Sequence, residues 1–439
     1  MGPSIAIIGG GPAGLTLAKL LDSSPHTRDC YTVFEADESA SSRVHSGGSL
    51  DLHVESGIAA LQKAGLYAEF VKRARFGGAE DLIISDQNGK EWFRKISDTT
   101  DEQFDRDHLP EHARPEIDRT DLLEMLLHSV RDAVMCWNHK IASVSDDGIL
   151  TFQSGRTAGP FDLVIGADGA WSKVRHVLTA PMPRYSGISG FQLRVLHGKE
   201  RHPQVAQSIG RGNHFCYSNG ASLTGQTLGD GSYTLGTWGR RPESWPEEVK
   251  QMSNNDPMQI KEAILDAYRG WCPEFRVWLQ ASEPSAAYQR GWGLFELPIE
   301  GDGPRWTHKQ GFTLIGDAAH LMTPFAGEGV NVAMLDALEL STNIIAAFER
   351  ASDQDVQSLD EAARAFEKGM FPRAHKVMKK THRNKTMMFH SEGPEVFIKV
   401  MRQMMEAAGL PPDTQLPPEK AGEMIGDYLE KQRQGKAQQ

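Results

Sequence analysis

Residues 5–21, IAIIGGGPAGLTLAKLL, decide the fold of this 439-residue chain. A buried apolar run leads into the pattern G-x-G-x-x-G at Gly9, Gly11 and Gly14, and a helical pattern follows. Gly9 allows a tight turn, Gly11 lets the backbone approach a pyrophosphate, and Gly14 lets the helix pack closely on the strand. The stretch therefore predicts a dinucleotide site at a helix N-terminus, where the helix dipole favours phosphate. The predicted contacts are Gly9, Gly11, Pro12, Ala13 and Gly14.

A carboxylate follows at the spacing that such a site requires. The stretch YTVFEAD places Glu35 at the end of a second predicted strand, roughly twenty residues after the glycines. There the carboxylate can accept hydrogen bonds from both ribose hydroxyls of an adenosine, and it disfavours a 2′-phosphate. Ala36 is the next predicted contact. The alternative is a tight strand-to-helix turn without a ligand, which the presence of Glu35 disfavours.

A second glycine-rich loop lies in residues 316–331, GDAAHLMTPFAGEGVN. It follows an apolar strand-like run and precedes a long helical pattern. The run delivers a carboxylate, Asp317, to a turn that contains Pro324, Gly327 and Gly329. This arrangement is suited to hold a ligand against the backbone N–H groups at the start of the next helix.

The composition favours a protein that binds a small molecule. With 58 acidic and 47 basic residues, the formal net charge is −11, which argues against nucleic acid or an anionic membrane as the main partner. The N-terminal stretch has neither a basic segment nor a long apolar segment, so we expect a cytoplasmic protein, and a monomer without a metal site. Four cysteines have neither paired nor metal-type spacing, and we expect free thiols at Cys30, Cys136, Cys216 and Cys272.

The dinucleotide-binding pattern is interrupted by segments of another kind. Residues 79–95 predict a β-hairpin that turns near Asn88 and Gly89. The predicted fold is α/β, with a Rossmann-type cofactor domain interwoven with a β-sheet substrate domain, and long C-terminal helices with a break at Pro372. The expected divisions are 1–76, 107–179 and 291–350 for the cofactor domain, 77–106 and 180–290 for the substrate domain, 351–410 for helices that brace the two domains, and 411–439 for a polar tail.

Three motifs, in this order and spacing, carry a resemblance to a known family. They are Gly-Gly-Gly-Pro-Ala-Gly at 9–14, Ala-Asp-Gly at 167–169 and Gly-Asp at 316–317. Over about residues 4–350 the chain resembles the single-component FAD-dependent monooxygenases of the para-hydroxybenzoate hydroxylase type. Within that group, four stretches are similar to the tetracycline destructases: GGSLDLH at 47–53, EIDRTDL at 116–122, SKVR at 172–175 and the 316–331 loop.

The resemblance implies that FAD is the cofactor and gives roles to individual residues. Asp317 would accept hydrogen bonds from the ribityl chain, and the loop from Pro324 to Gly329 would run along the isoalloxazine ring. Helix N–H groups would then face N1 of the flavin, where the reduced form carries negative charge. Asp168 either orders the loop around the pyrophosphate or contacts the cofactor. Further implied contacts are Gly316, Val330, Asn331, Asp51 at the flavin, Arg119 at the ribityl or phosphate region, and Arg43 at the nicotinamide cofactor; an ion pair is the alternative for Asp51, Arg119 and Arg43.

The implied reaction is hydroxylation of an electron-rich phenolic or enolic small molecule. NADPH or NADH would bind transiently and reduce the flavin, because the sequence has one G-x-G-x-x-G between a strand and a helix. Dioxygen would then give a flavin C4a-hydroperoxide, whose electrophilic oxygen attacks a phenolate or an enolate. A flavin oxidase or reductase without oxygen insertion, and a non-catalytic FAD-binding interaction protein, are the alternatives.

The resemblance also predicts substrate contacts. Gln207 takes the position of a family glutamine, His214 stands where the family has an arginine, and Thr234 stands where it has a histidine. Pro324 and Gly327 complete the predicted set. The two changed residues favour another enolic polyketide or fused phenol over tetracycline itself. For Gln207 and His214 the alternative is a partly exposed polar position on a strand.

Overall fold

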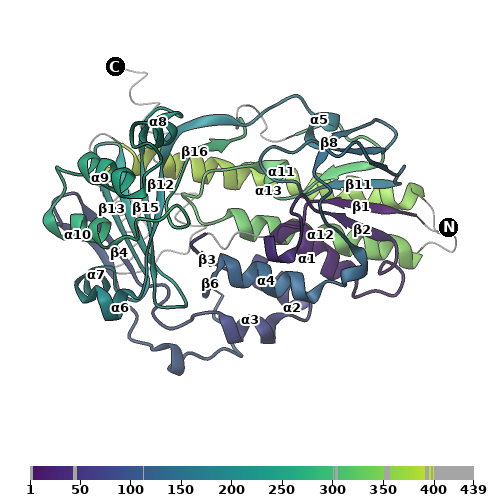
Figure 1. The fold of residues 1–439 in the computed structure, drawn as a ribbon. Helices are drawn as coiled ribbons and strands as arrows, with labels where there is room; N and C mark the ends of the chain where they lie inside the picture. The colour runs from purple at the N-terminus through teal and green to yellow at the C-terminus, as the bar shows by residue number, and fades with distance from the viewer. Residues whose placement is uncertain are drawn as a thin grey trace, which may run out of the picture. The chain divides into compact units, whose positions relative to one another are not determined.

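The structure is a computed structural model, and it describes residues 3–42, 47–111, 113–299, 301, 305–350, 356–390, 395, 396 and 399. The chain divides into two compact units that alternate along the sequence (Figure 1). Unit 1 comprises Met1–Gly77, Thr99–Ser186 and Leu294–His382, and unit 2 comprises Gly78–Asp98, Gly187–Gly293 and Arg383–Gln439.

Unit 1 is built on a five-stranded sheet with the strand order β17-β11-β1-β2-β7. All four strand pairs are parallel. Every residue of β1 is buried, as expected for a parallel strand that is covered on both faces. The predicted Rossmann-type sheet is thus confirmed. Its strands are β1 (Ile5–Ile8), β2 (Tyr31–Phe34), β7 (Met135–Cys136), β11 (Leu163–Gly166) and β17 (Phe312–Leu314).

The helices that follow the two glycine-rich stretches lie beside each other in this unit (Figure 1). They are α1 (Pro12–Leu21) and α12 (Gly329–Arg350). A Cβ on Gly14 would lie 2.0 Å from the Gly9 carbonyl oxygen, so glycine is required for this close packing. Among the described residues, α12 is the helix that is long and apolar enough to cross a bilayer, but 56% of its most apolar window is buried in the protein, as in a core helix.

Smaller elements complete unit 1. The antiparallel pair β3–β6 joins the stretch at 47–53 to the stretch at 116–122, and a second small sheet has the order β10-β9-β8. These elements are η1 (Ala40–Ser42), β3 (Ser49–Asp51), η2 (Val54–Ile58), α2 (Ala59–Lys63), α3 (Tyr67–Arg73), η3 (Asp101–Gln103), β6 (Glu116–Asp118), α4 (Arg119–Ser129), η4 (Asp132–Val134), β8 (Ile141–Val144), β9 (Leu150–Phe152), β10 (Thr157–Ala158), α5 (Arg175–Leu178) and α11 (Asp317–His320).

Unit 2 is built on a seven-stranded sheet with the order β16-β12-β15-β14-β13-β4-β5. The predicted hairpin at residues 79–95 is confirmed as β4–β5, with Gly89 in the turn at φ +83°. The elements are β4 (Leu82–Asp86), β5 (Glu91–Lys95), β12 (Arg184–Val195), α6 (Gly198–Arg201), α7 (Pro203–Ile209), β13 (Asn213–Ser218), β14 (Ala221–Thr227), β15 (Tyr233–Arg240), α8 (Trp245–Met252), α9 (Pro257–Ala267), α10 (Pro273–Ala281) and β16 (Arg290–Glu296).

The two faces of the unit 2 sheet differ. Successive side chains along a strand point to opposite faces of the sheet, and residues that are paired on neighbouring strands point to the same face. One face packs on α7, α9 and α10 in a common apolar core, and we call it the helix-covered face. Its central register row is Leu193, Leu235, Gly225, His214 and Ile83, and the next row, on the opposite face, is Arg194, Thr234, Gln226, Asn213 and Leu82.

The C-terminal helix α13 (Val356–Met388) is continuous over 33 residues. The predicted break at Pro372 is therefore wrong. Proline removes one backbone hydrogen bond from the helix interior. The helix continues because its buried positions Leu359, Phe366 and Met370 belong to the core of unit 1, and this packing outweighs the local preference. The predicted polar tail at 411–439 lies outside the described residues.

Candidate cofactor and substrate sites

The turn between β1 and α1 leaves room for a ligand at a helix N-terminus. Gly9 has φ +105°, and a Cβ there would lie 2.4 Å from the Ala167 carbonyl oxygen. Gly11 is different, because no atom lies within 4 Å of the position of its Cβ. Gly11 also provides no side-chain cap for α1, whose first turn contains Pro12 and Ala13. The first backbone N–H groups of α1 are thus available to a phosphate.

Glu35 lies against this turn. Its carboxylate accepts hydrogen bonds from the backbone N–H groups of Gly10 (2.6 Å) and Asp37 (3.0 Å). The side chain is 8% exposed, and the following residue, Ala36, is exposed. The structure therefore brings Glu35 and the glycine turn together. An ionised carboxylate has about four acceptor sites, so these two bonds are compatible with a ribose hydroxyl at the same side chain.

Asp168, which follows β11, orders the Ala-Asp-Gly loop. Its Oδ2 accepts a hydrogen bond from the Lys173 backbone N–H at 2.7 Å. Its Oδ1 is buried and has no hydrogen-bond partner within the described part of the chain. Desolvation raises the pKa of Asp168, although hydrogen bonds from Ser172 and Lys173 oppose this. Asp168 thus orders the loop through Oδ2, and its unpartnered Oδ1 is the atom that would contact a ligand.

Arg175 joins this loop to the Gly-Asp turn, and sequence analysis assigned it no role. The side chain is 2% exposed. Its guanidinium donates to the carbonyl oxygens of Ala170 (2.9 Å), Asp317 (3.1 Å) and Ala318 (2.7 Å). One buried cation thereby fixes the two loops that carry Asp168 and Asp317. The stretch SKVR after the Ala-Asp-Gly motif was the signal that pointed to it.

A buried carboxylate, Asp336, positions the Gly-Asp turn from the other side. Asp336 accepts hydrogen bonds from the Gly316 backbone N–H (2.9 Å), from Nε2 of His320 (2.6 Å) and from Arg373 (2.8 Å). Burial opposes ionisation, but attraction from His320 and Arg373 holds the pKa of Asp336 below its usual value. Gly316 itself has φ +60°, in the region that favours glycine.

Asp317 and Arg119 lie near each other on the surface of unit 1. Both side chains are exposed, whereas Gly316 and Ala318 on either side of Asp317 are buried. Dense packing around the accessible carboxylate desolvates it and raises the pKa of Asp317, against the attraction of His320, Arg119 and Arg175. An exposed carboxylate on a rigid buried turn is placed to bind a ligand hydroxyl.

The 324–329 loop is held against the end of β3. Asn331 is buried and donates to the carbonyl oxygens of Asp51 (2.8 Å) and Gly327 (3.3 Å). A Cβ on Gly327, which has φ +67°, would lie 3.0 Å from Asp51 Oδ1. No atom lies within 4 Å of the Cβ position of Gly329. Of the other predicted contacts here, Pro324 is exposed and Val330 is half-buried; Arg43 lies outside the described residues.

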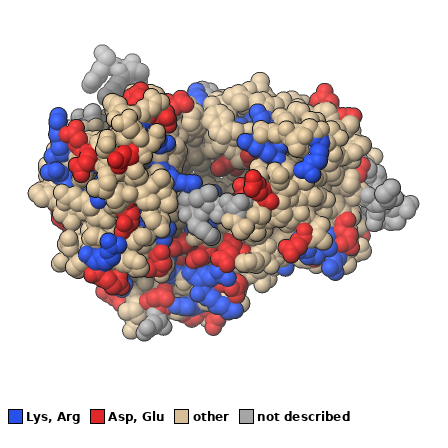
Figure 2. Space-filling view, in the orientation of Figure 1, with Lys and Arg blue, Asp and Glu red and all other residues tan. Residues whose placement is uncertain are grey.

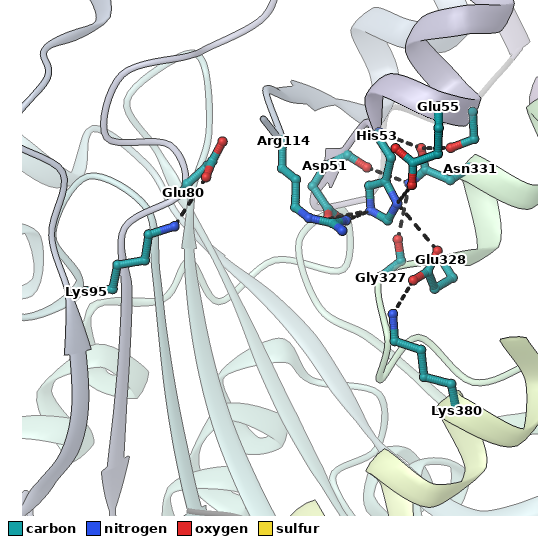
Figure 3. Close-up of polar contacts among 11 residues, drawn as sticks. Asp51, His53, Glu55, Glu80, Lys95, Arg114, Gly327, Glu328, Asn331 and Lys380 are labelled. Atoms are coloured by element: carbon teal, nitrogen blue, oxygen red, sulfur yellow. Dashed lines mark hydrogen bonds and ion pairs between the residues drawn. The ribbon is translucent and has the colours of Figure 1, made fainter. Parts of the chain in front are cut away.

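A buried histidine that sequence analysis missed lies between these segments (Figure 3). His53 is 2% exposed, and its Nε2 lies 3.1 Å from Asp51 Oδ2 and contacts Arg114. Its Nδ1 lies 3.5 Å from Glu328 Oε2, and Glu328 pairs with Lys380. Partial burial opposes ionisation of Asp51, but His53 and Arg114 outweigh it and hold the pKa of Asp51 below its usual value.

The three predicted substrate contacts of unit 2 are not brought together. Gln207 is exposed on helix α7 and does not lie on a strand. His214 is 3% exposed on the helix-covered face, where Nδ1 donates to the Ser208 carbonyl oxygen and Nε2 accepts from Ser85 Oγ, both at 2.8 Å. Burial lowers the pKa of His214, so its ring is neutral at pH 7. Thr234 points to the opposite face, so one ligand on this sheet contacts only part of the predicted set.

The face that carries Thr234 is rich in aromatic side chains, and we call it the aromatic face. Trp238 and Trp292 form a ring pair with centroids 5.0 Å apart. The register row of Thr234 continues from Leu82 to Lys95 of β5, and it contains two charged residues. Arg194 pairs with Asp230 at 2.7 Å. Lys95 pairs with Glu80 at 3.3 Å (Figure 3). Other members of this face are Phe215, Tyr217, Thr224, Gln226 and Asn213.

Comparisons with known proteins agree with this geometry. The chain matches the family described as "FAD binding domain" over residues 3–278 and 305–374. It is 34% identical over 438 residues to Monooxygenase penA of Penicillium thymicola, with 89% of this chain and 96% of that protein covered. The chain therefore belongs to this family and is an FAD-dependent monooxygenase.

Solved structures share the fold. Klebsiella pneumoniae HpxO, complexed with FAD and uric acid, has a TM-score of 0.68 at 18% identity, with 97% of each chain covered. Tetracycline destructase Tet(55) has a TM-score of 0.64 at 16% identity, with 96% of this chain and 97% of that chain covered. The residues of unit 1 fit FAD, because the uncapped start of α1 and the open positions at Gly11 and Gly329 leave space that a bound cofactor would fill.

Proposed function

We propose that this monooxygenase uses NAD(P)H and dioxygen to hydroxylate an uncharged, electron-rich aromatic or enolic small molecule. The observation that carries the substrate class is the aromatic face of unit 2. Aromatic rings bind planar rings by stacking and by edge contacts. The charged residues of the Thr234 row, Arg194 and Lys95, are each paired with a carboxylate, so neither is a dedicated partner for a substrate carboxylate. A tetracycline-like polyketide and another fused phenol both fall within this class.

Unit 1 supplies the cofactor site of the proposal. Bound FAD supplies the redox chemistry that accepts reducing equivalents and activates dioxygen. The start of α1 would bind the pyrophosphate, Glu35 the adenosine ribose, and Asp317 with Arg119 the ribityl region. The 324–329 loop would lie along the isoalloxazine ring, where Gly329 leaves space and the start of α12 offers backbone N–H groups to negative charge.

The protein's part in the reaction is to bind the flavin ring and the substrate and to exclude water. Oxygen insertion needs a dry site, because water that reaches the site before insertion lets the activated oxygen leave as hydrogen peroxide. The aromatic side chains support such a site, since they desolvate a planar ligand over a large area. We infer that Gln226, which is neutral and half-buried on this face, orients the substrate through a hydrogen bond.

The decisive experiment measures the fate of dioxygen. Purified protein, reduced with NADPH or NADH under isotopically labelled dioxygen, is offered neutral fused phenols and enolic polyketides, with their carboxylated analogues as controls. We expect NAD(P)H consumption that depends on the neutral substrate and a product that is one labelled oxygen heavier. Hydrogen peroxide as the sole oxygen product, or no turnover with any of the neutral compounds, would exclude this substrate class.

The same proposal includes a cytoplasmic, monomeric protein. All four cysteines are free, which supports a reducing compartment. Acidic and basic side chains are interspersed on the face shown in Figure 2, as on an ordinary soluble surface. Size-exclusion chromatography with light scattering tests the monomer, and a dimer mass would contradict it.

A further inference from the structure

Two polar side-chain atoms converge on the backbone of Gly236, which lies in β15. A Cβ on Gly236 would lie 2.5 Å from Nε1 of Trp238 and 2.6 Å from Oγ1 of Thr224. Thr224 reaches this point from the neighbouring strand β14, where it is the register partner of Gly236. An indole N–H and a hydroxyl therefore meet at one point of the aromatic face, and we call Gly236, Trp238 and Thr224 the Gly236 cluster.

The local sequence brings the indole over the backbone of β15. Trp238 follows Gly236 by two residues, so both positions share a face of the sheet. Side chains in strands lean along the strand direction, and the N–H edge of the indole lies over Gly236 because no Cβ is present there. Glycine inside a strand weakens the strand and often marks a point of close approach. A larger residue at position 236 would displace the indole N–H.

The two polar atoms of this cluster have no hydrogen-bond partner among the described residues. Trp238 makes a ring contact with Trp292, and its indole N–H has no acceptor in the described part of the chain. The Thr224 hydroxyl is likewise unpartnered there, and both side chains are half-buried, so they are accessible from the aromatic face. Thr237, the next residue in β15, points to the other face, and its hydroxyl bonds the backbone N–H and carbonyl oxygen of Phe191, both at 3.1 Å. Two neutral hydrogen-bonding groups are thus left for a ligand.

We propose that Trp238 and Thr224 bind a neutral oxygen substituent, a hydroxyl or a carbonyl, on the ring of the substrate. The Trp238 N–H donates to this oxygen. The Thr224 hydroxyl is both donor and acceptor, so it donates to a carbonyl oxygen or accepts from a hydroxyl. The inference rests on the proposed function, in which the aromatic face binds the substrate, and it adds the substituent that is recognised and the residues that recognise it.

The Gly236 cluster would fix the orientation of the substrate on the sheet. Stacking and edge contacts hold a planar ring on an aromatic face but leave its rotation within the plane poorly defined. A hydrogen bond to one substituent removes this freedom, as the few polar groups of a mostly apolar binding site do. Trp238 and Thr224 are therefore proposed as specificity-determining residues.

The test compares how two ligands of similar shape bind to the FAD-loaded protein, measured by equilibrium dialysis without NAD(P)H. 2-Naphthol carries a hydroxyl where 2-methylnaphthalene carries a methyl group, so the ratio of their affinities isolates the contribution of the oxygen. Trp238→Phe keeps a ring and removes the N–H, and Thr224→Val keeps the shape and removes the hydroxyl. We expect each variant to lower this ratio about fivefold relative to the wild type, as for the loss of one neutral hydrogen bond.

Unit 2 offers a matched control for each variant. Trp292→Phe removes the indole N–H of the ring that pairs with Trp238, and Trp292 is not among the atoms nearest to the Cβ position of Gly236. Thr237→Val removes a hydroxyl from the same strand but from the helix-covered face. Both controls should keep the wild-type ratio, because a change that weakens both ligands equally leaves the ratio unchanged.

The outcomes separate this inference from the proposed function. An unchanged ratio in Trp238→Phe or in Thr224→Val overturns the inference, and each variant decides the matter alone if the other does not fold. A ratio that falls equally in the controls also overturns it. In these cases, binding of both ligands by the wild type still supports an aromatic substrate face. If the wild type binds neither ligand, the proposed substrate class and the role of the Gly236 cluster are both excluded.

Discussion

The two units encode their ligand contacts in different ways. In unit 1 the proposed contacts depend on backbone positions. Glycine is required at Gly9 because a Cβ would collide, and we propose that it is required at Gly11 because a ligand needs the open space. In unit 2 they depend on which face of a strand a side chain occupies, and His214 and Thr234 occupy opposite faces. Backbone recognition therefore leaves a motif in the sequence, whereas side-chain recognition leaves a pattern that a shift of one residue inverts.

The largest expected effect is the difference in stability between substitutions at Gly9 and at Gly11. Gly9→Ala introduces a Cβ that would lie 2.4 Å from the Ala167 oxygen, at φ +105°. We expect it to lower the free energy of unfolding of the apoprotein by about 2–4 kcal/mol. Gly11→Ala points into open space, so we expect stability within about 0.5 kcal/mol of the wild type but at least about tenfold weaker FAD binding. Urea denaturation and fluorescence titration measure the two; equal apoprotein stabilities would contradict the distinction.

The second effect concerns the cation that joins the two cofactor loops. Arg175→Met leaves the buried carbonyl oxygen of Ala318 and the half-buried carbonyl oxygen of Ala170 without their donor. We expect a loss of about 3 kcal/mol in the free energy of unfolding, measured by urea denaturation. Arg269, whose side chain is 79% exposed, is the matched control, and Arg269→Met should change stability by less than about 0.5 kcal/mol. A similar small loss in both variants would show that Arg175 does not fix the loops.

The third effect is on the cofactor alone. Asp317→Ala removes an exposed carboxylate, so the apoprotein should keep its stability. FAD affinity should fall about ten- to a hundredfold, because charge-assisted hydrogen bonds contribute roughly 1.5–3 kcal/mol each. Asp266→Ala, at an exposed acidic position of unit 2, is the control and should bind FAD normally. Full FAD occupancy and unchanged affinity in Asp317→Ala would remove Asp317 from the site.

The fourth effect tests the two faces of the unit 2 sheet. Trp238→Leu takes an aromatic ring from the aromatic face, and we expect the KM for the aromatic substrate to rise about tenfold. His214→Gln instead disturbs two buried hydrogen bonds on the helix-covered face. It should lower the free energy of unfolding by about 1–3 kcal/mol without changing KM. A raised KM in His214→Gln at normal stability would return His214 to the substrate site.

The outcome for the sequence predictions follows from the range of each interaction. The glycine turns and the hairpin at Gly89 were predictable because each depends on a few consecutive residues. Asp336 and Arg175 were not, because they bind turns about twenty and about 140 residues away in the chain, and no local pattern records such a pairing. The break predicted at Pro372 was wrong because the prediction used only the local effect of proline, whereas packing against the core determines the length of α13.

The smallest expected effect is on the pH dependence of stability, and it involves two carboxylates of unit 1 whose pKa values are shifted in opposite directions. Partial burial raises the pKa of Asp51, but His53 and Arg114 outweigh it and hold this pKa below its usual value. The ionised form of Asp51 therefore stabilises the fold at neutral pH. This stabilisation is lost as the pH falls through the folded-state pKa of Asp51. Desolvation and the neighbouring Asp118 raise the pKa of Asp121, so its ionisation opposes folding at neutral pH. Because both side chains are partly exposed, each contribution should be below about 1 kcal/mol. Urea denaturation of the apoprotein between about pH 7 and about pH 3 should show Asp51→Asn less stable than the wild type only at the neutral end, and Asp121→Asn more stable there. The same sign of change in both variants at neutral pH would show that the charges around these two carboxylates do not act as the structure arranges them.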